Sequence, residues 1–110
     1  MTPDSAVLVY FRAAKADDIA PGSAVQVDIG ELSIALFNLD GEFYATEGYC
    51  THAFASLAEG TVIGEQIECP LHFARFSIKT GKVLSEPATE DLKTYPVRVE
   101  NGEIFVGLPE

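Results

Sequence analysis

The sequence predicts an all-β fold, a small antiparallel sandwich or barrel. Three observations predict it. Apolar and polar residues alternate in several short runs, Asp-Gly and Asn-Gly pairs separate such runs, and no apolar stripe of helical period extends beyond three turns. A chain of 110 residues has room for only one ordinary core. We therefore expect residues 1–110 to form a single domain of short antiparallel strands.

The first half of the chain contains four expected strands. They are residues 7–11, 24–29, 32–36 and 42–46. In the second of these, Val25, Val27 and Ile29 alternate with polar neighbours, as in a strand with one buried face. Asp40-Gly41 predicts a tight hairpin between the third and fourth strands. Residues 13–18 are expected to form a helical turn or a loop.

The second half begins with residues 48–60, which show no clean period. Beyond them, short strands are expected at residues 65–69, 74–78, 95–99 and 104–108. Thr80-Gly81 predicts a turn, and Asn101-Gly102 predicts a type I′ hairpin between the last two strands. Frequent glycine and proline residues along the whole chain agree with many short strands.

The charge balance limits the possible partners. Seven basic and seventeen acidic side chains give a formal charge of −10, which disfavours binding to nucleic acid or to an anionic membrane. No apolar run approaches the roughly 20 residues that span a bilayer, and Met1–Ser5 does not resemble the start of a signal peptide. We expect a soluble cytoplasmic protein that docks on basic surfaces.

One group of residues contains the side chains that could bind a metal centre. Cys50-Thr51-His52 is followed, after sixteen residues, by Cys69-Pro70-Leu71-His72, and the two motifs contain every cysteine and histidine of the chain. Each motif pairs one thiolate with one imidazole in an expected loop. Two such pairs suit a binuclear [2Fe–2S] centre, in which one iron takes both thiolates and the other iron takes both imidazoles.

These four residues have other interpretations. A structural disulfide is disfavoured in a chain without an export signal. Zinc is the main chemical alternative, because two cysteines and two histidines suit a tetrahedral site. Zinc fingers, however, usually pair cysteine with cysteine and histidine with histidine, and the C-x-H spacing is tight for one ion.

The motif resembles that of the Rieske iron–sulfur family, and the likeness extends from about Val7 to Leu108. Residues 55–57 and Gly60 resemble the first cluster loop of bacterial Rieske ferredoxins, and residues 75–76 with Thr80-Gly81 resemble the second. Glu86-Pro87-Ala88 resembles the proline-containing third loop. The resemblance implies a Rieske-like fold with a cluster-binding subdomain at about residues 48–88. Its cofactor would be one [2Fe–2S] cluster.

By this resemblance, Cys50 and Cys69 hold the inner iron, and His52 and His72 hold the outer iron nearer to solvent. The side chains implied to shield the cluster or to contact a partner are Phe54, Leu71, Phe73 and Pro87. Ala53 and Ala74 stand where many relatives have glycine. Backbone amides near Phe54, Ala55, Ala74 and Arg75 are expected to donate hydrogen bonds to the cluster sulfurs.

The resemblance is strongest to the ferredoxin component of multicomponent aromatic-ring dioxygenases. It implies an electron carrier, not an enzyme, which accepts electrons from an NAD(P)H-dependent flavoprotein reductase. The carrier then passes them to a terminal oxygenase. No histidine remains for the second iron site that a catalytic dioxygenase subunit needs. Two alternatives stay open: the small subunit of a nitrite-reductase-like enzyme, and a zinc-stabilised binding module without redox activity.

Overall fold

The computed structural model describes residues 8–50, 55–70, 73–85 and 90–109. Within these ranges the chain forms strands and two short 3-10 turns. The strands are β1 (Leu8–Lys15), β2 (Ala24–Ile29), β3 (Leu32–Leu39), β4 (Glu42–Glu47), β5 (Thr61–Ile63), β6 (Gln66–Glu68), β7 (Arg75–Ser77), β8 (Thr94–Tyr95), β9 (Val97–Glu100) and β10 (Glu103–Pro109). The 3-10 turns are η2 (Ala16–Asp18) and η3 (Leu57–Glu59).

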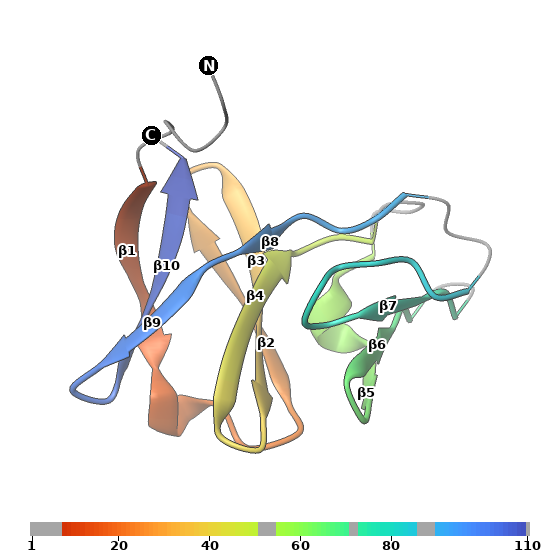
Figure 1. The fold of residues 1–110 in the computed structure, drawn as a ribbon, viewed down its shortest axis with the longest axis horizontal. Coiled ribbons are helices and arrows are strands. Elements are labelled where there is room, and N and C mark those ends of the chain that lie inside the picture. The colour runs from red at the N-terminus through yellow and green to blue at the C-terminus, as the bar shows by residue number, and fades with distance from the viewer. Residues whose placement is uncertain (1–7, 51–54, 71–72, 86–89, 110) are drawn as a thin grey trace.

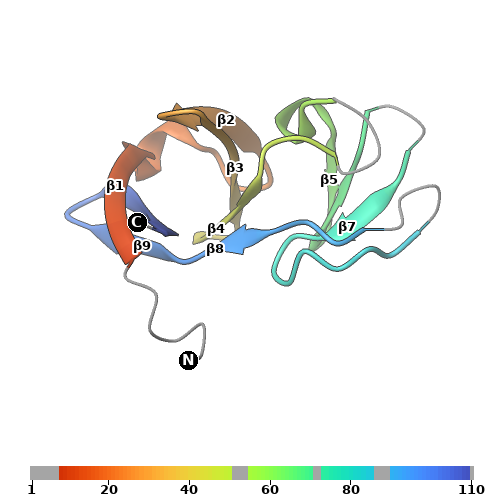
Figure 2. The ribbon, with the colours of Figure 1, turned by 90° about the horizontal axis from the view of Figure 1, so that it is seen from above.

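The strands form three antiparallel sheets. One has the order β1-β10-β9, the second has the order β2-β3-β4-β8, and the third has the order β5-β6-β7. The first two sheets curve around a common interior as a barrel, and the third stands beside the barrel (Figures 1 and 2). The prediction of an antiparallel all-β fold is confirmed.

Strand β3 is buried on both of its faces. Ile34 and Leu36 point into the barrel core with Ile104 and Val106, while Ala35 and Phe37 belong to a second core. This second core contains Ile67 and Phe76 of the third sheet together with both cysteines. The third sheet is therefore attached to the barrel through the outer face of β3, since apolar side chains from both parts are removed from water there.

The predicted turns are confirmed. Asp40 and Gly41 have φ angles of 54° and 93°, and Asn101 and Gly102 have φ angles of 53° and 76°. Positive φ at both central residues is the property of the type I′ turn, which matches the twist of the strands that it joins.

The helical turn or loop expected at residues 13–18 is confirmed only in part: Ala16–Asp18 forms η2, whereas residues 13–15 continue β1. Ala14 and Lys15 pair with Ile104 and Glu103 of β10, after a register shift between Arg12 and Ala14. The partner strand lies some 90 residues away in the sequence, and long-range pairing of this kind overrides local preference. No helix among the described residues is long and apolar enough to cross a membrane.

Candidate metal centre

Cys50 and Cys69 lie at the border between the barrel and the third sheet. Cys50 follows β4 of the barrel, and Cys69 follows β6 of the third sheet. Their exposed fractions are 5% and 0%, and both carry buried thiols rather than a disulfide. Both belong to the core that joins the two parts. The strand ends therefore place in one core two sulfur donors that are 19 positions apart in the sequence.

The same hydrogen bond closes the loop that each cysteine begins. The N–H of Cys50 donates to the carbonyl of Ala55 at 3.0 Å, and the N–H of Cys69 donates to the carbonyl of Ala74 at 2.7 Å. We call residues 50–55 the first loop and residues 69–74 the second loop. Both span six residues, begin with cysteine and end with a buried alanine.

The two loops also correspond in sequence. The first loop reads CTHAFA and the second reads CPLHFA, so cysteine, phenylalanine and alanine occupy the same first, fifth and sixth positions. Histidine stands third in one loop and fourth in the other. The sequence interpretation compared only the cysteine and histidine spacings and missed this correspondence. Aligning the two six-residue segments would have found it.

Several predicted site residues lie outside the described part of the chain. They are His52, Phe54, Leu71, His72 and Pro87. Within the described ranges, no three His, Cys, Asp or Glu side chains are grouped so as to hold a metal ion.

The donor set fits a Rieske-type cluster. Such a cluster takes two thiolates on one iron and two imidazoles on the other. Two buried thiols stand at matching positions of two equal loops, and each loop also carries one histidine. The apolar core around Cys50 and Cys69 gives the sulfur side of such a group a dry environment.

The second loop is anchored by the strands on either side of it. Glu68 and Arg75 are partners in the β6–β7 pairing, and their side chains form an ion pair with an Nε–Oε2 distance of 3.2 Å. The N–H of Arg75 donates to Ser85 Oγ at 3.1 Å. This amide, one of those near which donors to a cluster sulfur are expected, thus has Ser85 as its acceptor in this structure.

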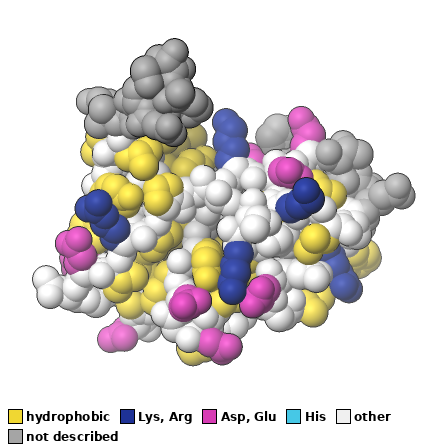
Figure 3. Space-filling model, viewed as in Figure 1, with side chains coloured by type: hydrophobic (Ala, Val, Ile, Leu, Met, Phe, Trp, Pro, Cys, Tyr) yellow, Lys and Arg dark blue, Asp and Glu magenta, His cyan; other side chains and the backbone are white. Residues whose placement is uncertain are grey.

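Exposed apolar side chains lie beside the second loop. Phe73 is 66% exposed and has a φ angle of 60°, a left-handed conformation that costs energy for a residue with a Cβ. Leu84, whose N–H donates to the carbonyl of Arg75 at 2.8 Å, is 47% exposed. On the face of the molecule that carries β7 to β9, lysine, arginine and acidic side chains are interspersed (Figure 3).

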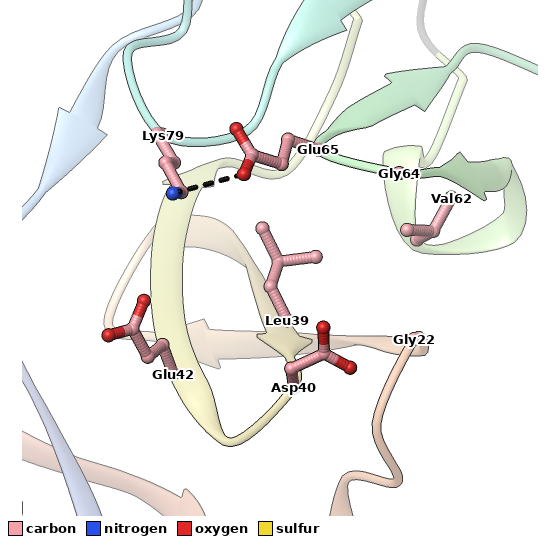
Figure 4. A pocket seen from close by; sticks show the side chains of 8 residues that line it. All are labelled: Gly22, Leu39, Asp40, Glu42, Val62, Gly64, Glu65 and Lys79. Atoms are coloured by element: carbon pink, nitrogen blue, oxygen red, sulfur yellow. Dashed lines mark ion pairs between the residues drawn. The ribbon is translucent and has the colours of Figure 1, made fainter.

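A separate cavity of about 590 Å³ lies between the barrel and the third sheet. It is lined by Gly22, Leu39, Asp40, Glu42, Val62, Gly64, Glu65 and Lys79 (Figure 4). Lys79 bridges its two sides, since its Nζ lies 3.2 Å from Glu65 Oε2 and 5.9 Å from the ring centroid of Tyr44. The pKa of Lys79 is raised, first by its hydrogen bond to Glu65. The cavity lies at the starts of β4 and β6, and the cysteines follow the opposite ends of these strands.

Comparison with known proteins assigns a family to this arrangement. The sequence model of the Rieske [2Fe-2S] domain matches residues 9–96. The 3-phenylpropionate/cinnamic acid dioxygenase ferredoxin subunit of Escherichia coli is 51% identical over 94 residues, which cover 84% of this chain and 88% of that protein. The biphenyl dioxygenase ferredoxin subunit of a Pseudomonas species is 43% identical over 100 residues, covering 90% and 92%.

Solved structures agree with this assignment. A structure of reduced oxygenase in complex with oxidised ferredoxin from carbazole 1,9a-dioxygenase contains a chain with a TM-score of 0.84 and 39% identity, covering 89% of this chain and 92% of that chain. A nitrite reductase small subunit from Mycobacterium tuberculosis also has a TM-score of 0.84, but only 27% identity, covering 94% and 98%. The fold is thus common to both kinds of protein, and the two relatives named above at 43% and 51% identity are dioxygenase ferredoxin subunits.

Proposed function

The chain belongs to the Rieske [2Fe–2S] family, and from this premise we propose that Cys50, His52, Cys69 and His72 hold the cluster of a dioxygenase ferredoxin. The protein is an electron carrier and not an enzyme in its own right. The observation that carries the ligand assignment is the matching closure of the first and second loops, which fixes two buried cysteines at equivalent positions.

The cluster, when bound, accepts and releases one electron. The chain's own residues make this exchange fast by keeping the ligands in place. Each loop base is closed by a cysteine N–H, and the thiols are packed in the core between β3 and the third sheet. A site that is rigid in both states needs little rearrangement during electron transfer. Cys50 and Cys69 would hold one iron in this core, and His52 and His72 would hold the other.

Residues 1–110 are proposed to act as one unit, with residues 48–88 as its cluster-binding subdomain. The third sheet, η3 and both loops fall within this range. They pack on β3 through a shared core, which ties the position of the loops to that of the barrel.

We propose two transient partners, a flavoprotein ferredoxin reductase and a terminal oxygenase. A ferredoxin of the carbazole system has been seen in complex with its oxygenase, and the same electron-transfer step is proposed for this chain in the cytoplasm. Phe73 is the proposed apolar contact among the described residues, because exposing a large aromatic side chain in a left-handed conformation has no benefit for folding. Phe54, Leu71 and Pro87 are proposed to extend this contact.

Spectroscopy of the purified protein tests the ligand assignment. The wild type is expected to be red-brown, with two irons per chain and, after reduction, an EPR signal of lower average g than all-cysteine clusters give. Cys69→Ser should abolish the signal, while Ser23→Ala, which removes a hydrogen bond to the carbonyl of Ala20 in the barrel, should keep it. A colourless wild type that contains one zinc ion per chain would overturn the proposal.

A turnover assay tests the proposed partners. The protein is mixed with NADH and with the reductase and oxygenase of a biphenyl or a 3-phenylpropionate dioxygenase system. Oxygen uptake that requires this chain is the expected result. A protein that accepts electrons from the reductase but never reduces either oxygenase would instead favour a subunit of another enzyme, such as a nitrite reductase.

A further inference from the structure

A hydrogen-bond network on the outer face of β2 reaches both ends of the first loop. Its centre is Gln26, an exposed side chain on the barrel. Ser56 Oγ donates to Gln26 Oε1 at 2.5 Å, and Gln26 Nε2 donates to Ser33 Oγ at 3.3 Å and to Tyr49 Oη at 3.5 Å. Tyr49 directly precedes the first loop and Ser56 directly follows it. One carboxamide thus connects β2 and β3 with both flanks of the loop.

The base of the first loop has fewer paired strand positions than that of the second, although the N–H of Leu57 also donates to the carbonyl of Gly48 there at 2.9 Å. The second loop stands on β6 and β7, which pair at three successive positions and end in the Glu68–Arg75 ion pair. At the base of the first loop, Tyr49 and Ser56 form one isolated bridge outside the named strands. A side-chain connection from the barrel can supply the order that a longer strand pairing supplies in the second loop.

The chemistry at position 26 requires a carboxamide. The hydroxyl hydrogen of Ser33 is donated to Asp28 Oδ1 at 2.8 Å, so Ser33 can only accept a hydrogen bond from residue 26. Ser56, by contrast, donates its hydroxyl hydrogen to residue 26 and needs an acceptor there. Glutamine has a donor and an acceptor on one rigid group. Glutamate has no donor for Ser33 and would add a charge beside Asp28, and leucine has neither.

The outer face of β2 lies next to the loop for a structural reason. Gln26 pairs with Ala35 of β3, and Ala35 is buried in the core that also contains Cys50 and Ala55. In addition, η3, which follows Ser56, lies against β2 and β3. Gln26 therefore stands at the edge of the packed interface between the barrel and the first loop, where a hydrogen bond restrains the loop's outer side.

We propose that Gln26 is a positioning residue for the cluster site: it fixes both ends of the first loop to the barrel and thereby fixes Cys50. The inference rests on the proposed function, because it assigns the role of Cys50 to cluster binding. Gln26 acts through Tyr49 and Ser56 and has no role in the electron transfer itself. The sequence interpretation gave no sign of it, since its partners lie 23 and 30 residues away.

The test compares purified holoprotein variants by the rate at which an iron chelator bleaches the cluster. Gln26→Leu should lose its cluster about fivefold faster than the wild type or more, as expected when side-chain hydrogen bonds at a loop base are removed. Ser23→Ala is the control, because it removes a different side-chain hydrogen bond, to the carbonyl of Ala20 just before β2, and leaves the network of Gln26 in place. Its rate should stay within about twofold of the wild type.

A positioning role also predicts changes that a merely structural role would not produce. Gln26→Leu should alter the g values of the reduced cluster and its midpoint potential, and Ser23→Ala should alter neither. Gln26→Glu should give an intermediate effect, since it keeps the acceptor for Ser56 and loses the donor for Ser33. The double variant Gln26→Leu/Ser56→Ala should lose its cluster no faster than Gln26→Leu, because both changes remove the same connection.

The outcomes separate the two proposals. A wild type without a [2Fe–2S] cluster would overturn the proposed function. A normal wild-type cluster with equal bleaching rates, g values and potentials in Gln26→Leu and Ser23→Ala would overturn the role of Gln26 alone. A lower melting temperature in Gln26→Leu with unchanged g values and potential would also overturn it, because the side chain would then support only the fold. Ser56→Ala, a smaller change, provides the same readouts should Gln26→Leu fold poorly.

Discussion

The N–H of Cys69 donates a 2.7 Å hydrogen bond to the carbonyl of Ala74, the residue that ends its loop. Ala74 is completely buried, and the next residue begins β7. The position of the cysteine is therefore tied to a strand of the third sheet and not only to its own loop. A substitution at Ala74 should therefore change the properties of the cluster as well as those of the third sheet.

The midpoint potential of the wild type should lie in the lower part of the Rieske range, which extends from roughly −150 to +300 mV. Hydroxyl donors to the sulfurs raise the potential of high-potential family members, and the matching positions here are Ala74 and Phe76, which have none. The formal charge of −10 also opposes the addition of an electron. Protein-film voltammetry measures the midpoint, and a value above zero would contradict the prediction.

Ala74→Ser should raise the midpoint potential. The new hydroxyl stands at the loop position where high-potential relatives have serine, and a donor to sulfur stabilises the reduced state. A gain of about 1 kcal/mol corresponds to roughly 40 mV for a one-electron couple. Ala45→Ser, which adds a hydroxyl at a buried alanine of the barrel core, is the control. It should lower stability without moving the midpoint, and equal midpoints for both variants would refute the argument.

Gly60→Ala should destabilise the part of the chain that carries the first loop. The φ angle of Gly60 is −82°, which alanine adopts freely, but a Cβ would lie 2.1 Å from the carbonyl oxygen of Glu68. Backbone atoms cannot yield easily, so a loss of about 1–3 kcal/mol in unfolding free energy is expected. Denaturant unfolding of the holoprotein measures it.

Gly64→Ala separates steric from conformational effects. Gly64 has a φ angle of +60°, and no atom lies within 4 Å of the position that an added Cβ would take. Only the backbone strain of about 1 kcal/mol applies there. If Gly64→Ala proved more harmful than Gly60→Ala, the close approach of Gly60 to Glu68 would not be the controlling contact.

Local features of the fold were predictable from the sequence. Asp40-Gly41 and Asn101-Gly102 specify their turns through residues that accept positive φ, without help from the rest of the chain. Alternation predicted which side chains of β2 face the barrel core. The four proposed ligands were also found locally, because short spacings place a cysteine and a histidine in the same loop.

Features that depend on distant partners were not predictable. Strand β5 has only three residues and exists through its pairing with β6. The strand expected at residues 32–36 stopped short of Phe37, which belongs to β3 and is buried because the third sheet covers it. Gln26 is an ordinary polar residue of a strand until the fold places Ser56 beside it. In each case the information lies in a contact between segments that are far apart in sequence.

Tyr95→Phe should make the protein less sensitive to alkaline pH. Burial raises the pKa of the Tyr95 phenol above 10.0, and the negative charge of Glu47 raises it further. A group with a higher pKa in the folded state contributes stability that is fully present below the unfolded pKa and lost as pH rises through the folded value. The loss should therefore begin near pH 10 and be smaller in Tyr95→Phe.

Melting temperatures of both proteins between about pH 8 and pH 12 test this prediction. Near pH 8 the difference between the two melting temperatures should not depend on pH. Above pH 10 the melting temperature of the wild type should fall more steeply than that of Tyr95→Phe. Some alkaline loss should persist, because the pKa of Tyr44 is also raised, first by burial and then by its hydrogen bond to Glu42. Parallel curves over the whole range would refute the role of Tyr95.

Phe73→Gly should slow electron transfer to the oxygenase without weakening the fold. Phe73 is 66% exposed, so its removal costs little buried apolar area, and glycine adopts the φ angle of 60° without strain. Stability should therefore change by less than about 1 kcal/mol. An aromatic docking contact stabilises a complex by about 1 kcal/mol or more. Its loss should lower the second-order rate constant for reduction of the oxygenase about fivefold. Val99→Ala, at an exposed apolar residue of β9 in the barrel, is the control. Stopped-flow reduction of the oxygenase at several ionic strengths measures both variants, and equal rate constants would remove Phe73 from the docking surface.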